Sequence, residues 1–171
     1  MSTLTRVIKA ALNEISKPES ARKGKEFECF TRSQLFTSDD YDMLERTHDY
    51  TNNKNDYVDS SKKPDFKFRS RKTGKEFFVE AKYHSEFYKG AVEYKPYQFR
   101  RYKAINKEVP VYIVIGVGQR AESPEQVFLI PVRDISIKYD KLSRNFLNKY
   151  RIPLDPMHRC RRAIDAIVES G

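Results

Sequence analysis

The amino-acid sequence predicts an α/β fold with a central mixed β-sheet flanked by α-helices. Apolar residues recur at helical spacing near the amino terminus, and a polar–apolar alternation typical of a β-hairpin follows at residues 65–83. Two apolar segments, 111–117 and 126–131, indicate buried strands. Helical and strand patterns therefore follow each other along the chain, and this order favours a sheet with helices on its faces.

The chain is long enough for one domain with one core. It has 171 residues, of which 39% are hydrophobic and 13% aromatic, so it can bury a core but leaves little room for a second domain. We expect a single domain over residues 1–171. It would comprise an N-terminal amphipathic helix at 1–20, a core at 24–117, and a helical, basic C-terminal segment at 140–171.

Two helices are expected first. Six apolar residues at three- and four-residue steps share one helical face: Leu4, Val7, Ile8, Ala11, Leu12 and Ile15. Pro18 and the polar residues 19–24 end this helix. A second helix is expected over residues 25–36, where Phe27 and Phe30 mark the buried side.

A strand and a loop precede the hairpin. Residues 37–50 are acidic and aromatic and contain a candidate first strand at 43–46. Residues 51–56 are polar and rich in asparagine, which predicts a loop.

The hairpin is the clearest local pattern. Residues 65–69 alternate polar and apolar side chains, residues 72–75 supply a turn containing glycine, and residues 76–83 form the return strand. Alternate residues of a strand point to opposite faces, so Glu80 and Lys82 share one face of the return strand.

The second half of the chain alternates again. Residues 84–96 are expected to be irregular, and a helix is expected over 96–107 with a proline near its start. Strands follow at 111–117 and 126–131, and helical structure is expected after residue 140.

The charge balance is basic. The chain has 33 Lys and Arg against 24 Asp and Glu, which gives a formal net charge of +9. This excess favours polyanionic partners, nucleic acid above all.

Several classes of protein do not fit. No apolar segment is long enough to cross a bilayer, so no membrane partner is expected. Two cysteines, Cys29 and Cys160, and three histidines, His48, His84 and His158, make neither a disulfide scaffold nor a zinc site. We therefore expect a cytoplasmic, reducing location.

Two carboxylates and one ammonium are predicted to meet on the hairpin. Pro64 and Asp65 open its first strand, and Glu80 and Lys82 lie on the return strand beside it. Asp65 and Glu80 offer the hard oxygen ligands that Mg²⁺ or Mn²⁺ prefers. Lys82 would contact a scissile phosphate and orient or help deprotonate an attacking water. Such a set suits metal-assisted hydrolysis of a phosphodiester.

The pattern Pro64-Asp65 followed by Glu80-Ala81-Lys82 resembles the PD-(D/E)XK nuclease superfamily, with Glu80 fifteen positions after Asp65. The resemblance implies a restriction-endonuclease-like core and metal-dependent cleavage of nucleic acid, with Asp65, Glu80 and Lys82 as the catalytic residues.

Two flanking helices add to the resemblance. Gly24 followed four positions later by Glu28 is similar to the first helix of archaeal Holliday-junction resolvases and Mrr-like restriction enzymes, which implies Glu28 as a third metal ligand. Gln98 and Tyr102 match the Q-x-x-x-Y helix of the RecB-type branch, and with Arg101 they could reach the DNA backbone or brace the metal ligands. The two signals point to different branches.

Alternative interpretations stay open at each position. Asp65 could be a turn residue, and Glu80 with Lys82 could be the solvated face of an edge strand. Glu26 competes with Glu28 as the helix carboxylate. Lys67 and Arg69, near the hairpin tip, are candidate phosphate contacts or solvated turn residues.

The sequence thus predicts a divalent-metal-dependent deoxyribonuclease that uses Mg²⁺ or Mn²⁺. A nucleic-acid-binding module of the same fold without turnover is the alternative, and a structural protein with an acidic partner is a third. RNA stays open as a substrate, as does the choice between endonuclease and exonuclease. Cutting both strands with one site per chain would favour a homodimer.

Overall fold

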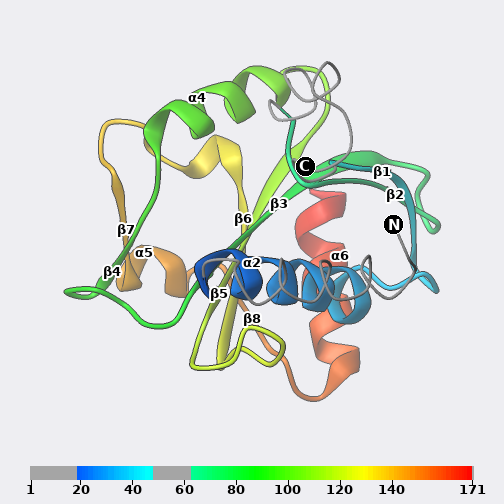
Figure 1. Ribbon diagram of the computed structural model, residues 1–171. Helices are drawn as coiled ribbons and strands as arrows, with labels where there is room; N and C mark the ends of the chain where they lie inside the picture. Colours follow the sequence, from blue (N-terminus) through cyan, green and yellow to red (C-terminus); the bar gives the residue numbers. More distant parts are fainter. Residues whose placement is uncertain (1–18, 48–62, 171) are drawn as a thin grey trace, which may run out of the picture.

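The structure is a computed structural model, and it describes residues 19–47 and 63–170. In this part of the chain, six strands form one sheet in the order β1-β2-β3-β5-β6-β8, and β4 pairs with β7 (Figure 1). The strands are β1 (Tyr41–Arg46), β2 (Phe66–Ser70), β3 (Glu76–His84), β4 (Ala91–Glu93), β5 (Val111–Val117), β6 (Gln126–Pro131), β7 (Lys141–Ser143) and β8 (Arg151–Ile152). The helical elements are α2 (Glu19–Phe30), the π-helical turn η1 (Thr31–Leu35), α4 (Pro96–Ile105), the 3₁₀ turn η2 (Val132–Asp134), α5 (Arg144–Asn148) and α6 (Met157–Glu169).

The sheet is mixed, as predicted. Strands β3 and β5 pair in parallel, whereas the β1–β2, β2–β3, β5–β6 and β6–β8 pairs are antiparallel. The connection between the two parallel strands carries β4 and α4, which is the crossover that a parallel pair requires.

Helices cover both faces of this sheet (Figure 1). On one face, α2 and α6 pack through side chains such as Phe27 and Ile164 against Val79 of β3. On the other face, α4, α5 and the β4–β7 pair pack against the sheet, with Phe99 of α4 in the same apolar cluster as Phe78 of β3. The predicted α/β architecture with helices on both faces is therefore confirmed.

Strand β3 occupies an interior position between β2 and β5. Its odd-numbered residues Phe77 and Val79 belong to the α2 side, and Phe78 belongs to the α4 side. Glu80 follows the alternation onto the α4 side and is only 4% exposed. The alternative that Glu80 sits on a solvated edge strand is wrong.

Most of the predicted elements are present at nearly the expected bounds. The hairpin forms as β2 and β3, the two apolar segments form β5 and β6, and the helix expected at 96–107 ends at Ile105. The first strand begins at Tyr41, two residues before the expected start.

The start of α2 corrects one prediction. Residues 19–24 were expected to interrupt the helices, but α2 begins at Glu19 and runs through them. Ion pairs one helical turn apart explain this, because Glu19 pairs with Lys23 at 2.7 Å and Arg22 pairs with Glu26 at 2.5 Å. A charged segment can thus continue a helix on its solvent face.

The small sheet formed by β4 and β7 corrects another prediction. Residues 84–96 were expected to be irregular and residues after 140 helical, yet β4 and β7 pair with each other and β8 joins the main sheet. These strands have two or three residues each, too short for an alternation to show in the sequence. Helices α5 and α6 do lie in the C-terminal segment, as expected.

The N-terminal helix expected at residues 1–20 falls outside the described residues except for Glu19 and Ser20, which belong to α2, and the polar loop expected at 51–56 lies outside them too. Among the described helices, none has the length and apolar character that crossing a bilayer requires. Cys29 and Cys160 are both free thiols.

Candidate active site

The register of the hairpin brings Asp65 to Glu80. Phe66 pairs with Val79, so the preceding residue Asp65 lies across from Glu80 on the next strand. Strand β3 continues to His84 after β2 has ended. The Asp65 carboxylate takes the place of a further strand partner there, because its Oδ2 accepts a hydrogen bond of 2.8 Å from the backbone N–H of Ala81.

The backbone around Asp65 is fixed by Thr47. The Thr47 N–H donates to the carbonyl of Asp65 at 2.8 Å, and the Thr47 hydroxyl donates to the carbonyl of Pro64 at 2.7 Å. Pro64 is itself buried. The Asp65 side chain thus bonds to a neighbouring strand rather than to its own turn, which disagrees with the alternative that it is a simple turn residue.

Lys82 lies against Glu80 on the same face of β3. Its Nζ is 2.5 Å from Glu80 Oε1, and the exposed fractions of the two side chains are 30% for Lys82 and 5% for Glu80. The carboxylate is therefore held inside the protein, whereas the lysine side chain is partly exposed. The structure brings Asp65, Glu80 and Lys82 together, as the hairpin pattern predicted.

Glu28 approaches the same group from α2. Its charge contributes to raising the pKa of Asp65, which places it within electrostatic reach, and its Oε2 is 3.6 Å from Nη2 of Arg46. Glu26, the competing carboxylate, pairs instead with Arg22 on the exposed side of the helix. The geometry therefore favours Glu28 over Glu26 as the helix carboxylate near the site.

The electrostatics are those of a crowded acidic site. Burial raises the pKa of the Asp65 carboxyl well above its ordinary value, and the charges of Glu80 and then Glu28 raise it further. The Ala81 N–H and the Lys82 ammonium oppose this shift. A cation bound here in addition to the Lys82 ammonium would stabilise the charged form of Asp65, because it would offset the repulsion among the carboxylates.

Lys82 keeps its proton. Burial alone would lower the pKa of its ammonium, but the charge and hydrogen bond of Glu80, with a smaller contribution from Asp65, raise the pKa above the ordinary lysine value. At neutral pH the side chain is therefore a cation and a hydrogen-bond donor.

Tyr102 on α4 is bonded to the same carboxylate. The side chain is 2% exposed, and burial, the charge of Glu80 and a hydrogen bond with Glu80 all raise the pKa of its hydroxyl. The hydroxyl thus stays protonated and donates to Glu80. Tyr102 braces a candidate ligand, which is one of the two roles considered for it, while Gln98 lies half-buried one turn earlier.

Arg101 lies beside Tyr102. Its guanidinium is 5.9 Å from the centroid of the Tyr102 ring. Its Nε is buried and has no hydrogen-bond partner within the described part of the chain. A buried donor without an acceptor is unusual in folded proteins and calls for an explanation.

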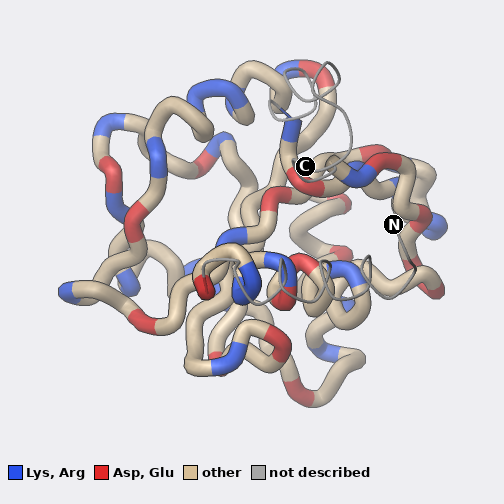
Figure 2. Tube along the Cα trace, viewed as in Figure 1, with Lys and Arg blue, Asp and Glu red and all other residues tan. Residues whose placement is uncertain are grey.

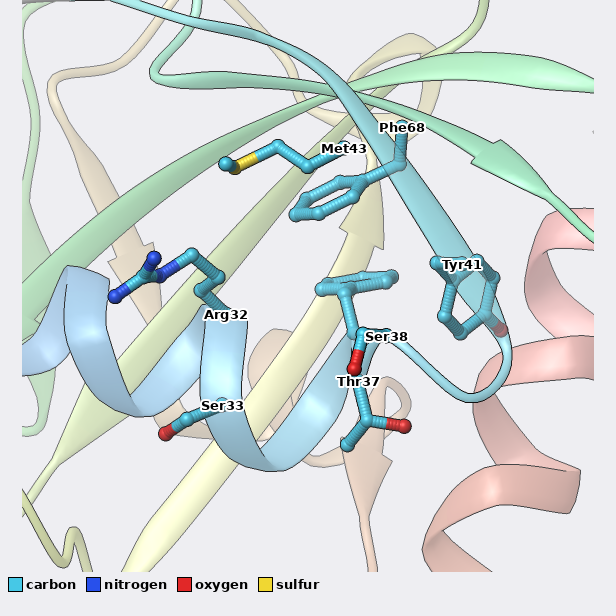
Figure 3. Close-up of a pocket in the computed structure, with 8 residues that line it drawn as sticks. Arg32, Ser33, Thr37, Ser38, Tyr41, Met43 and Phe68 are labelled. Carbon is cyan, nitrogen blue, oxygen red and sulfur yellow. The ribbon is translucent and has the colours of Figure 1, made fainter.

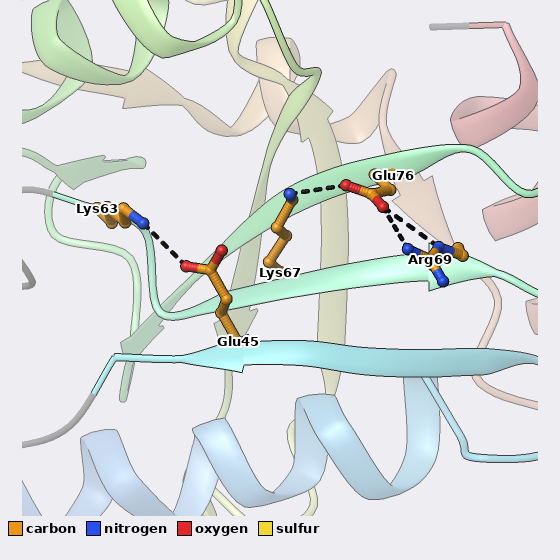
Figure 4. Close-up of polar contacts among 5 residues, drawn as sticks. All are labelled: Glu45, Lys63, Lys67, Arg69 and Glu76. Carbon is orange, nitrogen blue, oxygen red and sulfur yellow. Dashed lines mark hydrogen bonds and ion pairs between the residues drawn. The ribbon is translucent and has the colours of Figure 1, made fainter.

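The basic side chains of the hairpin, Lys67 and Arg69, are already paired with a carboxylate of the same hairpin. Glu76 pairs with Lys67 at 2.7 Å and with Arg69 at 2.6 Å (Figure 4). Lys67 also lies over the Phe78 ring at 5.7 Å. Lys67 and Arg69 are thus aligned on the strand face that carries Asp65, but a phosphate would have to compete with Glu76 for them.

The donor set fits a hydrated divalent cation. Among the described residues, no group of three or more His, Cys, Asp and Glu side chains is arranged as a ready cage for a metal. Mg²⁺ seldom needs one, since it commonly binds through one or two carboxylates and keeps water or substrate oxygens in its shell. Asp65 and Glu80 supply these carboxylates.

A separate cavity lies on the α2 side of the sheet (Figure 3). Its volume is about 370 Å³, and its lining combines apolar side chains such as Met43 and Phe68 with hydroxyls such as Ser33 and with Arg32. No carboxylate lines it. It therefore does not offer the chemistry of the Asp65 group.

Comparison with known proteins finds similarity among solved structures. No protein-family model matches the sequence, and no curated protein does. Among solved structures, Hjc of Archaeoglobus fulgidus, a Holliday junction resolvase from an archaeal hyperthermophile, is similar with a TM-score of 0.52 and 11% identity, over 74% of this chain and 88% of the resolvase chain. This chain has the resolvase's fold. The restriction-endonuclease-like fold implied by the PD-(D/E)XK resemblance is therefore confirmed.

Two residues near the site were not predicted as part of it. Thr47 fixes the backbone of Asp65, and Tyr97 lies close enough to Lys82 to affect the pKa of the ammonium. No sequence signal marks Thr47, because its partners are distant in the chain. Tyr97 does carry a signal, since it belongs to a segment in which aromatic residues are interleaved with Lys82, Lys89 and Lys95, a combination that suits unstacked bases and phosphates.

Proposed function

We propose that this chain is a divalent-metal-dependent nuclease that hydrolyses phosphodiester bonds of DNA. The observation that carries the proposal is the juxtaposition of Asp65 with Glu80 across the hairpin, with the Lys82 ammonium 2.5 Å from the Glu80 carboxylate. Two carboxylates and an ammonium on one strand face provide the minimum set for positioning a metal, a water and a phosphate.

Each residue has a distinct role in the proposal. Asp65 and Glu80 would hold Mg²⁺ or Mn²⁺, with Glu28 contributing from α2. When bound, such a cation would polarise the scissile phosphate and lower the pKa of a coordinated water. Lys82 keeps its proton, so it would act as a cation that binds a phosphate oxygen and orients the attacking water.

The proposed substrate follows from charge and from the structural match. The net charge of +9 attracts a polyanion, and the similar structure is that of a protein named as a Holliday junction resolvase. We therefore propose DNA as the substrate and partner.

The test is a cleavage assay with purified protein in Mg²⁺, in Mn²⁺ and with chelator, on linear duplex, single-stranded, flap and four-way-junction DNA. We expect cleavage only with metal. Asp65→Asn and Lys82→Ala should each reduce the rate by at least about 100-fold, because each removes part of a group that acts as a unit. DNA binding measured in chelator should survive both changes.

The matched control is Asp42→Asn. Asp42 is a carboxylate on the outer strand β1 that pairs with Arg71 at 2.7 Å, so its loss changes the charge by the same amount outside the site. The Asp42→Asn variant should cleave DNA at the wild-type rate. Undiminished cleavage by a pure preparation of Asp65→Asn would overturn the proposal.

A DNA-binding module without turnover is the second candidate. The net charge of +9 supports it, because a basic chain attracts DNA whether or not it binds a metal. Calorimetric titration of the folded protein with Mn²⁺ separates the two: the nuclease should bind the metal and lose that binding in Asp65→Asn, whereas the module should show no metal binding.

A further inference from the structure

Helix α4 presents a second row of side chains next to the one that braces Glu80. Gln98 and Tyr102 are four residues apart on one row, and Tyr97 and Arg101 are four apart on the adjacent row. Tyr102 bonds to Glu80, so the first row faces the candidate active site. The adjacent row, Tyr97 and Arg101, therefore lies at the border of the candidate active site.

Tyr97 is an exposed aromatic ring within electrostatic reach of Lys82. It is 57% exposed and lies in the first turn of α4, directly after Pro96. It is also among the groups that act electrostatically on the Lys82 ammonium. An exposed aromatic ring beside a cation is the combination that proteins use to stack an unpaired base while holding its phosphate.

Arg101 supplies a donor that lacks an acceptor. Its Nε is buried without a hydrogen-bond partner within the described part of the chain, although the adjacent Tyr102 hydroxyl is satisfied by Glu80. Arg101 as a whole is half-buried, so its guanidinium fork can bind a phosphate at the surface, and a turn of the side chain toward that phosphate would give the buried Nε an acceptor. Figure 2 shows further Lys and Arg along α4, so this side of the site is basic.

We propose that the Tyr97–Arg101 row holds the nucleotide next to the cleaved phosphate, with Tyr97 stacking on an unpaired base and Arg101 binding the neighbouring phosphate. This rests on the proposed function, and it names the substrate class: DNA with unpaired nucleotides at the cut. A base within a continuous duplex is stacked on both sides and cannot offer its face to Tyr97.

DNA binding measured in the presence of a metal chelator tests this inference without requiring cleavage. Fluorescence anisotropy would compare a labelled continuous duplex with the same duplex containing a three-nucleotide bulge. We expect the wild-type protein to bind the bulged DNA about 5- to 150-fold more tightly, the range that one stacked base supplies. A 2-aminopurine placed in the bulge should lose fluorescence on binding if it stacks on Tyr97.

Four variants separate the roles. Tyr97→Ala should bind both DNAs equally and leave 2-aminopurine unquenched, whereas Tyr97→Phe, which keeps the ring, should behave as wild type. Arg101→Ala should weaken binding to both DNAs by a similar factor, because phosphate contacts carry no base information. Tyr88→Ala is the matched control, since Tyr88 is a tyrosine of similar exposure, 59%, on the connection between β3 and β4.

Three outcomes would overturn the inference. One is an unchanged preference in Tyr97→Ala. Another is loss of the preference in Tyr97→Phe, since the hydroxyl rather than the ring would then matter. The third is an equal loss in Tyr88→Ala. If the wild-type protein cleaves DNA with metal but shows no preference for the bulge, only this inference fails. If it never cleaves yet shows the Tyr97-dependent preference, only the proposed chemistry fails.

Discussion

At the scale of single residues, Glu80 is the centre of the candidate site. It is a buried carboxylate, and a buried charge is tolerated only when it is paired and hydrogen-bonded. Lys82 pairs with it from the same strand and Tyr102 donates to it from α4. Glu80 is thus held in place on the strand next to Asp65, as a metal ligand would need to be.

Tyr102→Phe should separate this bracing from folding. Loss of the hydroxyl leaves Glu80 with one donor fewer and free to rotate, so we expect the cleavage rate constant to fall about 10-fold, roughly the effect of misplacing one catalytic group. The free energy of unfolding should fall by about 1 kcal/mol, as for a typical lost hydrogen bond. Single-turnover cleavage and urea denaturation measure the two quantities.

The control for this change is Tyr94→Phe. The Tyr94 hydroxyl donates to the carbonyl of Ser136, away from Glu80. Its removal should lower stability by a similar amount and leave the cleavage rate constant unaltered. Equal rates for Tyr102→Phe and the wild-type protein would show that Glu80 needs no brace.

At the scale of elements, the close packing of α2 on β5 positions Glu28. Phe27 is fully buried, and a Cβ built on Gly116 of β5 would lie 2.2 Å from Cε2 of the Phe27 ring. Only glycine leaves room for the ring at this point. Glu28 follows Phe27 directly in the helix, so the depth of Phe27 against the sheet sets how near Glu28 comes to Asp65.

Gly116→Ala should therefore destabilise the protein by about 1–3 kcal/mol, because the added methyl forces the Phe27 ring or α2 to move. Gly24→Ala is the opposite case, since Gly24 lies within α2 and an added Cβ meets nothing within 4 Å. It should stabilise the protein by about 0.5–1 kcal/mol through helix propensity. Urea denaturation of both variants tests the pair, and a Gly116→Ala protein as stable as wild type would contradict the packing argument.

At the scale of the whole molecule, the excess of basic residues is spread over the surface. Many cations are already paired within the protein: Lys63 with Glu45 at 2.9 Å, and Lys67 and Arg69 with Glu76. A paired cation must break its ion pair before it can bind a phosphate. The number of side chains available to bind phosphate is therefore smaller than the net charge suggests. The number of phosphates bound has to be measured.

Salt dependence gives that number. We expect the logarithm of the DNA association constant to fall linearly with the logarithm of salt concentration, by about 0.9 for each phosphate neutralised. Arg101→Ala should reduce the slope by about one phosphate. Anisotropy titrations between roughly 50 and 200 mM salt would measure it. A flat response would favour the third hypothesis, a structural protein whose basic surface meets an acidic partner.

The sequence by itself determined the local part of this protein. Alternation along residues 65–83 specified the hairpin and put Glu80 and Lys82 on one face, and the apolar runs specified β5 and β6. These features depend on the periodicity of a few neighbouring residues, and that periodicity is visible without knowing the rest of the fold.

The tertiary structure alone decided which distant groups meet. It pairs β4 with β7 and brings Glu28, rather than Glu26, within electrostatic reach of Asp65. It also pairs Lys67 and Arg69 with Glu76 and places the Tyr102 hydroxyl on Glu80. Residues far apart in the chain come together only when whole elements pack, and the orientation of each element depends on the complete core. Local patterns carry no record of that orientation.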